Sequence, residues 1–200
     1  AVLCRAKNAI PGLVEALRRA GIPYQTRGMQ GVLEDPGVRL VRAALEVTDD
    51  PEKSASLLIL LDRYRLGLSD LQAVGRNPHR FTPYQIVMEG GAEVSAEAAL
   101  RLEKLRGILT ELRENAAFAT PLVLARLAHR LLDLDIEQQL PGSPCHAAAY
   151  VEFLNLVRDF GRTPGATLSG FLNWLSAGED EEASFADLDF EVDNAAVQII

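Results

Sequence analysis

The stretch that decides the fold is SAEAALRLEKLRGILTELREN, residues 95–115. Leucines recur along it at the three- and four-residue spacing of one helix face, and Glu and Arg side chains flank that face. These apolar positions are Leu102, Leu105, Leu109 and Leu112. An apolar stripe of this length must be covered by other parts of the protein. The sequence therefore predicts a helical body packed around residues 95–115.

Helical signals continue on both sides of this segment. Apolar residues recur at helical spacing within residues 10–17, 124–134, 150–157 and 168–175. At Asp35-Pro36, Asp50-Pro51, Thr82-Pro83 and Thr120-Pro121, an Asp or a Thr stands directly before a proline. This pair is typical of a helix start, because the side-chain oxygen accepts a free N–H group and proline has no N–H to satisfy. Helices should begin near residues 36, 51, 83 and 121.

The two ends of the chain have a different pattern. The opening AVLCRA and the stretch IPYQTR, residues 22–27, are strand-like on either side of a helix, and the closing NAAVQII is uncharged and β-branched. Strands that open and close a chain can pair with each other. The predicted fold class is therefore mainly α, an α+β fragment: a helical bundle-like insertion with a small sheet formed by strands at the N- and C-terminal ends.

Composition indicates a globular protein of an ordinary kind. The chain has 200 residues, of which 48% are hydrophobic and 24% charged. No apolar run approaches the roughly 18 residues of a membrane span, and no secretory signal is visible. Two cysteines, Cys4 and Cys145, are too few for a disulfide framework, and three scattered histidines do not form a metal pattern. We expect a cytoplasmic protein without a membrane or metal partner.

The charge is unevenly distributed. The net charge is −8, which argues against nucleic acid as a partner. Residues 179–193, however, contain eight of the 28 acidic side chains and no Lys or Arg, so the rest of the chain has 20 acidic and 20 basic residues. The pattern predicts that this acidic segment is a solvated linker, and the segment is a candidate site for a basic protein partner.

The sequence contains no familiar catalytic motif. A phosphate-binding P-loop, a dinucleotide fingerprint, a nucleophile elbow and a zinc-protease helix motif are all absent from it. We therefore expect no catalytic residue in this chain.

One stretch is a candidate for binding phosphate: DRYRLGLSDLQAVGRNPHR, residues 62–80. It predicts a helix, a tight glycine turn and a second helix whose start Ser69 can cap. Free N–H groups at such a start favour an anion, and neighbouring arginines add charge-assisted hydrogen bonds to a nucleic-acid backbone. The candidate residues are Arg63, Arg65, Gly67 and Ser69. The alternative is an ordinary helix–helix corner that binds nothing.

A second candidate lies near the N-terminus. Arg5 and Lys7 follow a predicted strand and precede a predicted helix, where the crevice at a strand's carboxyl end can hold a ligand. The alternative is a connection with solvated charges.

Four stretches of the sequence, in residues 1–28, 27–47, 60–74 and 196–200, resemble UvrD/Rep/PcrA-type superfamily 1 DNA helicases. AVLCRAKNAIPGLVEALRRAGIPYQTRG is similar to the family's strand that ends in Arg and the helix after it, and RGMQGVLEDPGVRLVRAALEV is similar to the turn and helix that follow. LLDRYRLGLSDLQAV resembles the Gly-hydrophobic-Gly turn of the helical 2B domain, although Ser69 replaces the last glycine. The closing AVQII is similar to a strand of the second motor domain, 2A.

The resemblance implies a division of the chain and a function. Residues 1–30 would belong to motor domain 2A, residues 31–190 to a 2B-like helical insertion ending in the acidic linker, and residues 191–200 to a returning strand of 2A. The intact parent would be an ATP-dependent 3′–5′ DNA helicase, a nucleotide-binding hydrolase of DNA repair or recombination.

The resemblance also implies which partners this piece would have. ATP and Mg²⁺ would bind parts of the parent outside this piece, which would need no cofactor and would be inactive alone. This piece would contact the remaining motor domains and duplex DNA or a fork junction, the DNA through Arg63, Arg65, Gly67 and Ser69 and more weakly through Arg5 and Lys7. The alternative is a helical protein–protein interaction module that does not bind DNA, which the net negative charge favours.

Overall fold

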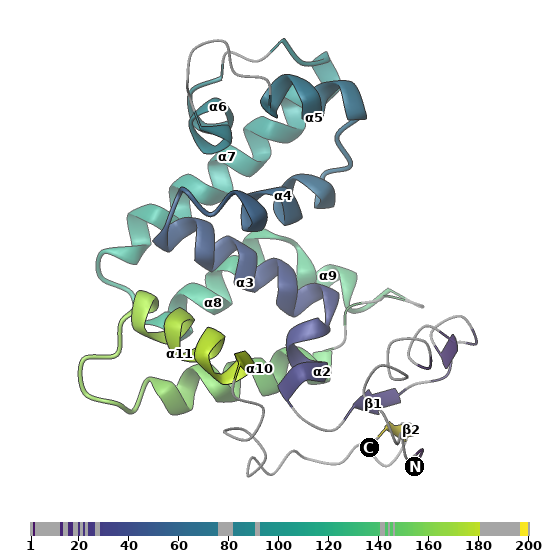
Figure 1. The fold of residues 1–200 in the computed structure, drawn as a ribbon, viewed down its shortest axis with the longest axis vertical. Coiled ribbons are helices and arrows are strands. Elements are labelled where there is room, and N and C mark those ends of the chain that lie inside the picture. Colours follow the sequence, from purple (N-terminus) through teal and green to yellow (C-terminus); the bar gives the residue numbers. More distant parts are fainter. Residues whose placement is uncertain are drawn as a thin grey trace.

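The computed structural model describes residues 2, 13, 16, 17, 20, 22, 24–26, 29–75, 82–90, 93–140, 143, 145, 147–180 and 197–199. Helices dominate these residues (Figure 1). In chain order they are α2 (Met29–Glu34), α3 (Pro36–Asp49), α4 (Ser54–Arg63), α5 (Leu68–Gly75), α6 (Pro83–Glu89), α7 (Ala96–Ala116), α8 (Pro121–Leu131), α9 (Leu134–Glu137), α10 (Ala147–Phe160) and α11 (Leu168–Asp180).

Three of the four predicted helix starts are confirmed. The Asp35 carboxylate accepts hydrogen bonds from the N–H groups of Gly37 and Val38, at 2.8 and 3.2 Å, before α3. Thr82 forms a reciprocal capping box before α6, and Thr120 caps α8. Each cap satisfies N–H groups that the helix itself leaves free.

The predicted start near residue 51 is wrong. Asp50 accepts a hydrogen bond from the N–H of Glu52 at 3.0 Å, which closes a local turn, and α4 begins only at Ser54. An Asp side chain two residues from its partner favours such a turn as readily as a helix cap, which is why the pattern alone misplaced the start.

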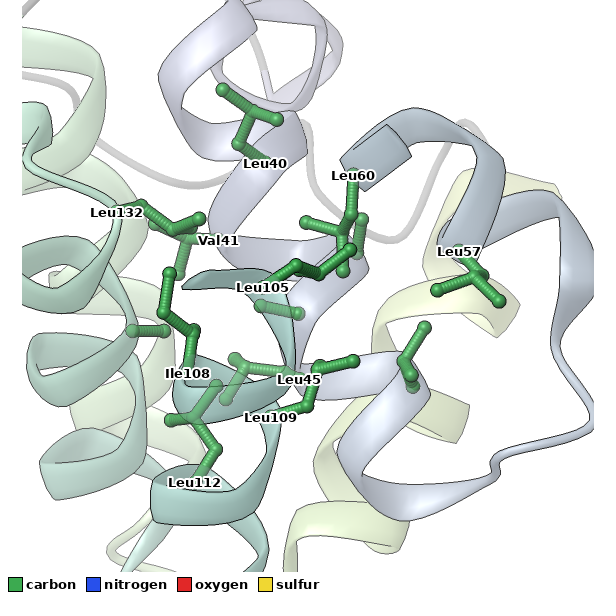
Figure 2. Packing of buried hydrophobic residues seen from close by; sticks show 14 of the residues in the cluster. Leu40, Val41, Leu45, Leu57, Leu60, Leu105, Ile108, Leu109, Leu112 and Leu132 are labelled. Atoms are coloured by element: carbon green, nitrogen blue, oxygen red, sulfur yellow. The ribbon is translucent and has the colours of Figure 1, made fainter. Parts of the chain in front are cut away.

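The core forms around α3 and α7, as residues 95–115 predicted. Leu105 and Leu112 of α7 are fully buried, and Figure 2 shows Leu105 and Leu109 gathered with Val41 and Leu45 of α3. Helices α4 and α8 also pack on α3. Burying each of these side chains is worth about 1.5–3 kcal/mol, so this shared contact is a large contribution to the stability of the helical body.

A cluster of aromatic rings joins α10 to α11. Phe153 and Phe171 are fully buried with ring centroids 6.0 Å apart in an edge-to-face arrangement. Phe160 lies 5.6 Å from both Phe171 and Trp174. Edge-to-face pairs add about 0.5–1.5 kcal/mol beyond the burial of their area. The rings therefore hold these two helices together beneath α3 in the view of Figure 1.

The predicted fold class α+β is wrong. In the described residues, paired strands are limited to β1 (Tyr24–Thr26) and β2 (Val197–Ile199), which lie parallel with Tyr24 opposite Val197. Three residues a side do not make a sheet with a packed face, and two-stranded pairs are marginal by themselves. The fold is mainly α, and the expected sheet is not one of its structural layers. The predicted opening strand lies outside the described residues, apart from Val2.

Candidate nucleic-acid interface at the α4–α5 corner

The predicted helix–turn–helix at residues 63–70, here called the α4–α5 corner, is present. Helix α4 ends at Arg63, and the N–H of Arg65 donates to the carbonyl of Asp62 at 2.9 Å. Arg65 has a φ of 48°, in the left-handed region where glycine is usual after a helix. A residue with a side chain adopts this conformation at a cost of about 1–2 kcal/mol. The corner therefore places an exposed arginine where glycine would be less strained.

Helix α7 holds the corner through Arg101. Its Nη1 donates to the Arg65 carbonyl at 2.9 Å, and its Nη2 pairs with the carboxylate of Glu97, one turn earlier on α7. The planar guanidinium group thus uses its two arms on two different acceptors, which fixes its orientation. Arg65, the strained residue of the corner, is therefore held by a hydrogen bond from a different helix, α7.

A second tie comes from Asp70, in the first turn of α5. Its carboxylate accepts hydrogen bonds from the N–H and the Oγ of Ser95, at 2.8 and 3.1 Å. Ser95 in turn caps α7, because its Oγ accepts from the N–H of Ala98 at 3.2 Å. One carboxylate therefore serves the positive ends of two helices.

Asp70 weakens the expected phosphate site at the start of α5. A Cβ atom added to Gly67 would lie 3.3 Å from its Oδ2, so the carboxylate is directly beside the turn. A negative charge there competes with an anion for the N–H groups at the helix start. The turn alone is thus a poorer phosphate site than the sequence indicated, and the contribution of Arg65 becomes decisive.

Arg63 forms an ion pair with another residue of the protein. Its Nη2 lies 2.6 Å from Oε2 of Glu137, with side chains 31% and 22% exposed, so the pair joins the end of α4 to α9. Nearby, Lys104 of α7 pairs with Asp133 at 2.7 Å, and this hydrogen bond is the main reason that the pKa of Lys104 is raised. Burial raises the pKa of the half-buried Tyr64 hydroxyl between these pairs.

The structure locates four of the six predicted site residues. Arg65, Gly67 and Ser69 are exposed together at the corner, with the partly buried Arg63 beside them. Helix α5 begins at Leu68, so Ser69 is its second residue and not the cap that the sequence predicted. Arg5 and Lys7, and the basic stretch 76–80, lie outside the described residues. DNA binding by any of these residues stays a prediction.

Sequence reasoning missed several residues of the corner. Arg101, Asp70 and Ser95 come from positions 25 to 36 residues away from their partners, and no local pattern marks such pairs. Two exposed leucines were also missed: Leu68, 73% exposed on α5, and Leu100, 69% exposed on α7. The exposure of Leu68 could have been predicted, because it lies in the predicted turn between Gly67 and Ser69.

Outside the corner, Cys145 and His129 are titratable groups that are buried among the helices. No group of His, Cys, Asp or Glu residues there is arranged to hold a metal ion. Burial raises the pKa of the Cys145 thiol to about 11, which keeps it protonated and unreactive. Burial lowers the pKa of His129, whose ring stacks on Tyr150 at 3.7 Å. These groups belong to the packing of the helices.

A groove between α6 and α7 has a volume of about 410 Å³. It is lined by Tyr84, Met88, Glu89, Thr110, Arg113 and Glu114. Its single guanidinium group, on Arg113, donates to the Tyr84 hydroxyl at 2.9 Å, while Glu89 and Glu114 are exposed at its edge. The groove therefore lacks the basic character that a nucleic-acid backbone requires. Within the described ranges, no helix has the length and apolarity needed to cross a bilayer.

Comparison with known proteins gives one distant similarity. No protein-family model matches the chain. The chain is 24% identical over 206 residues to a subunit of the ATP-dependent helicase/nuclease of Leuconostoc mesenteroides. The match covers all of this chain but only 16% of that protein, so the chain spans about one sixth of the relative's length. The similarity supports a distant link to a helicase protein.

Proposed function

We propose that this chain is a helical accessory part of an ATP-dependent DNA helicase, and that its α4–α5 corner contacts duplex DNA. The similarity of the whole chain to part of a helicase/nuclease supports the first statement. The observation that carries the second is Arg65: its backbone is held in a left-handed conformation by Arg101, while its side chain is exposed. An arginine presented in this way suits a phosphate group.

In this proposal, the residues of the corner contribute differently to DNA binding. Arg65 supplies the main contact, because its side chain has no ion pair within the described residues, whereas Arg63 shares its charge with Glu137. Gly67 and Ser69 are exposed beside it and offer backbone and hydroxyl donors to the same backbone. Because Asp70 opposes an anion and the corner makes up to two phosphate contacts, we expect modest affinity that falls with salt at a log–log slope of about −1 to −2.

The wider assignment is also part of this proposal. Residues 1–30 and 191–200 belong to motor domain 2A, and residues 31–190 form a 2B-like insertion that steers DNA at a fork or regulates the motor. The parent unwinds DNA 3′ to 5′ in repair or recombination and uses ATP and Mg²⁺ bound by its other motor segments. This piece hydrolyses no ATP by itself. Arg5 and Lys7 contribute from the motor-domain side.

The test is the binding of a labelled DNA fork by the chain and by an Arg63→Ala/Arg65→Ala variant, measured by fluorescence anisotropy at several salt concentrations. The double change should weaken binding by about tenfold or more and reduce the salt slope by about 1–2, because up to two phosphate contacts are lost. Glu137→Gln is the control for the broken ion pair, since it frees Arg63 without removing it. Unchanged affinity and slope in the double variant would contradict the assignment.

A protein-interaction module is the second candidate, and a specific observation favours it. Leu68 and Leu100 are 73% and 69% exposed on α5 and α7, and the chain has a net charge of −8. Exposed apolar side chains and acidic charge are typical of a surface that binds a basic protein, for which residues 179–193 provide a further site. A Leu68→Ser/Leu100→Ser variant with unchanged DNA binding but lost capture of the parent's other segments would support this function.

A further inference from the structure

We propose that Arg101 is a positioning residue for the DNA contact of Arg65, so that α7 controls the interface without touching the nucleic acid. This inference rests on the proposed function. It assigns a role to a residue that lies 36 positions from its partner along the chain.

The first step is the strain at Arg65. A φ of 48° is unfavourable for a residue with a Cβ atom, and the helix end would relax toward other conformations without an external tie. The hydrogen bond of 2.9 Å from Arg101 Nη1 to the Arg65 carbonyl supplies that tie. Losing it would let the peptide after Arg65 rotate, which changes the direction in which the Arg65 side chain leaves the corner.

The second step is the state of the Arg101 side chain. Its other arm pairs with Glu97, a carboxylate on the preceding turn of α7, which offsets its charge. Each of its two terminal nitrogens thus donates to a protein acceptor, and 37% of the side chain is exposed. A guanidinium group in this condition is suited to holding the corner and poorly suited to binding a phosphate.

The third step is the independence of the tie from the fold. Asp70 and Ser95 join α5 to α7 separately, through hydrogen bonds of 2.8 and 3.1 Å. The leucines of α7 that are fully buried in the core, Leu105 and Leu112, lie in later turns of the helix than Arg101. Truncating Arg101 therefore leaves the corner attached and the core intact, and the conformation of Arg65 is the feature that changes.

A double-mutant cycle tests this role directly. Binding of a labelled fork is measured for the chain, Arg65→Ala, Arg101→Ala and the double variant, with thermal unfolding as the check on folding. We expect Arg101→Ala to weaken binding by about three- to fivefold without lowering the melting temperature by more than a few degrees. In the Arg65→Ala background the second change should have no further effect, because there is no longer a side chain to orient.

Two further variants separate positioning from loss of charge. Lys104→Ala removes a cation one turn further along α7 that pairs with Asp133 and does not contact Arg65, so it should change affinity less than twofold. Arg101→Lys retains one donor for the carbonyl and should recover part of the affinity. Partial recovery by lysine, together with little effect of Lys104→Ala, marks the hydrogen bond, and not the net charge, as the cause.

One set of results would contradict the positioning role of Arg101, and another would contradict the proposed DNA contact of Arg65. If the effects of Arg65→Ala and Arg101→Ala multiply in the double variant, Arg101 contacts DNA itself and the positioning role is wrong. If Arg65→Ala weakens binding while Arg101→Ala does not, the positioning role is wrong and the DNA contact stands. If Arg65→Ala leaves binding unchanged, the proposed DNA contact at this corner fails.

Discussion

The α3–α7 core and the α4–α5 corner share helix α7 but are held together by opposite means. In the core, Leu105, Leu109 and Leu112 are nearly or fully buried against other apolar side chains. At the corner, the same helix contributes Arg101 and its cap Ser95, which hold the turn through directed hydrogen bonds. Burial of apolar side chains contributes much free energy but does not depend on their orientation. Hydrogen bonds depend on orientation and so fix one backbone conformation, although each contributes little net free energy. The comparison indicates that the N-terminal part of α7 holds the corner, whereas the turns from Leu105 onward stabilise the core.

The largest effect should come from breaking the core face. Leu105→Ala removes a fully buried side chain between α3 and α7 and should lower the free energy of unfolding by about 2–5 kcal/mol. Leu100→Ala, on the same helix but 69% exposed, should change it by less than about 0.5 kcal/mol. Urea denaturation of both variants makes the comparison. Similar losses for the two leucines would contradict the assignment of faces.

The next effect should come from the tie at Asp70. Asp70→Ala removes both acceptors of Ser95 and should destabilise the chain by about 1–2 kcal/mol. It also removes the negative charge beside the turn, so binding to a DNA fork should become tighter at low salt. Denaturation and anisotropy on the same sample measure the two changes. A variant that loses both stability and DNA affinity would show that Asp70 supports the interface and does not oppose it.

A smaller effect of opposite sign is expected at Arg65. Arg65→Gly relieves the left-handed strain and should raise the free energy of unfolding by about 0.5–1 kcal/mol, whereas Arg65→Ala should not. Both variants lose the guanidinium group and should bind the fork equally weakly. Thermal unfolding distinguishes them. A loss of stability in Arg65→Gly would mean that the arginine is retained for the fold and not for a partner.

The smallest expected effect is the pH dependence of the free energy of unfolding that arises from His129 in the helical body. Burial lowers the pKa of His129 in the folded chain below its ordinary value of 6.5, so the unfolded chain takes up the proton first as the pH falls. Stability contributed by the neutral ring is therefore complete above pH 6.5 and is lost as the pH falls from there through the lowered pKa. Asp135 and Gln138 face the ring and moderate the loss.

His129→Phe keeps a ring against Tyr150 and removes the titration. Urea denaturation between pH 7.5 and about pH 5.5, above the range where most carboxylates titrate, should show a smaller decline for this variant than for the unmodified chain. An identical decline in both would exclude His129 as its source.

The same comparison shows what the sequence predicts well. The leucine spacing of residues 95–115 identified the buried face of α7, and Asp35, Thr82 and Thr120 marked helix starts, because both signals depend on residues a few positions apart. The α4–α5 corner was also located, through Gly67 and its flanking arginines. Local physics was enough for these features.

Features that depend on distant residues were not predictable from one sequence. Ser69 was expected to cap α5, yet the helix begins at Leu68, one residue before Ser69, and the Asp70 carboxylate accepts hydrogen bonds from Ser95. Arg63 was expected to be free for phosphate, yet Glu137, on a helix 74 positions later, pairs with it. The terminal strands looked like a sheet because β-branched residues favour strands, but strand propensity does not determine whether a packed sheet forms. For Arg63 and Asp70, a tertiary contact decided between local alternatives.

The most direct test of the central claim is a salt-dependent anisotropy titration of the unmodified chain with two probes, a labelled fork with a duplex arm and a single strand of the same length. The account predicts tighter binding to the fork and a decline with salt at a log–log slope of about −1 to −2, since the corner makes up to two contacts with duplex phosphates. Absence of binding at low salt, or equal binding to both probes, would contradict it and leave protein contact as the function of this surface.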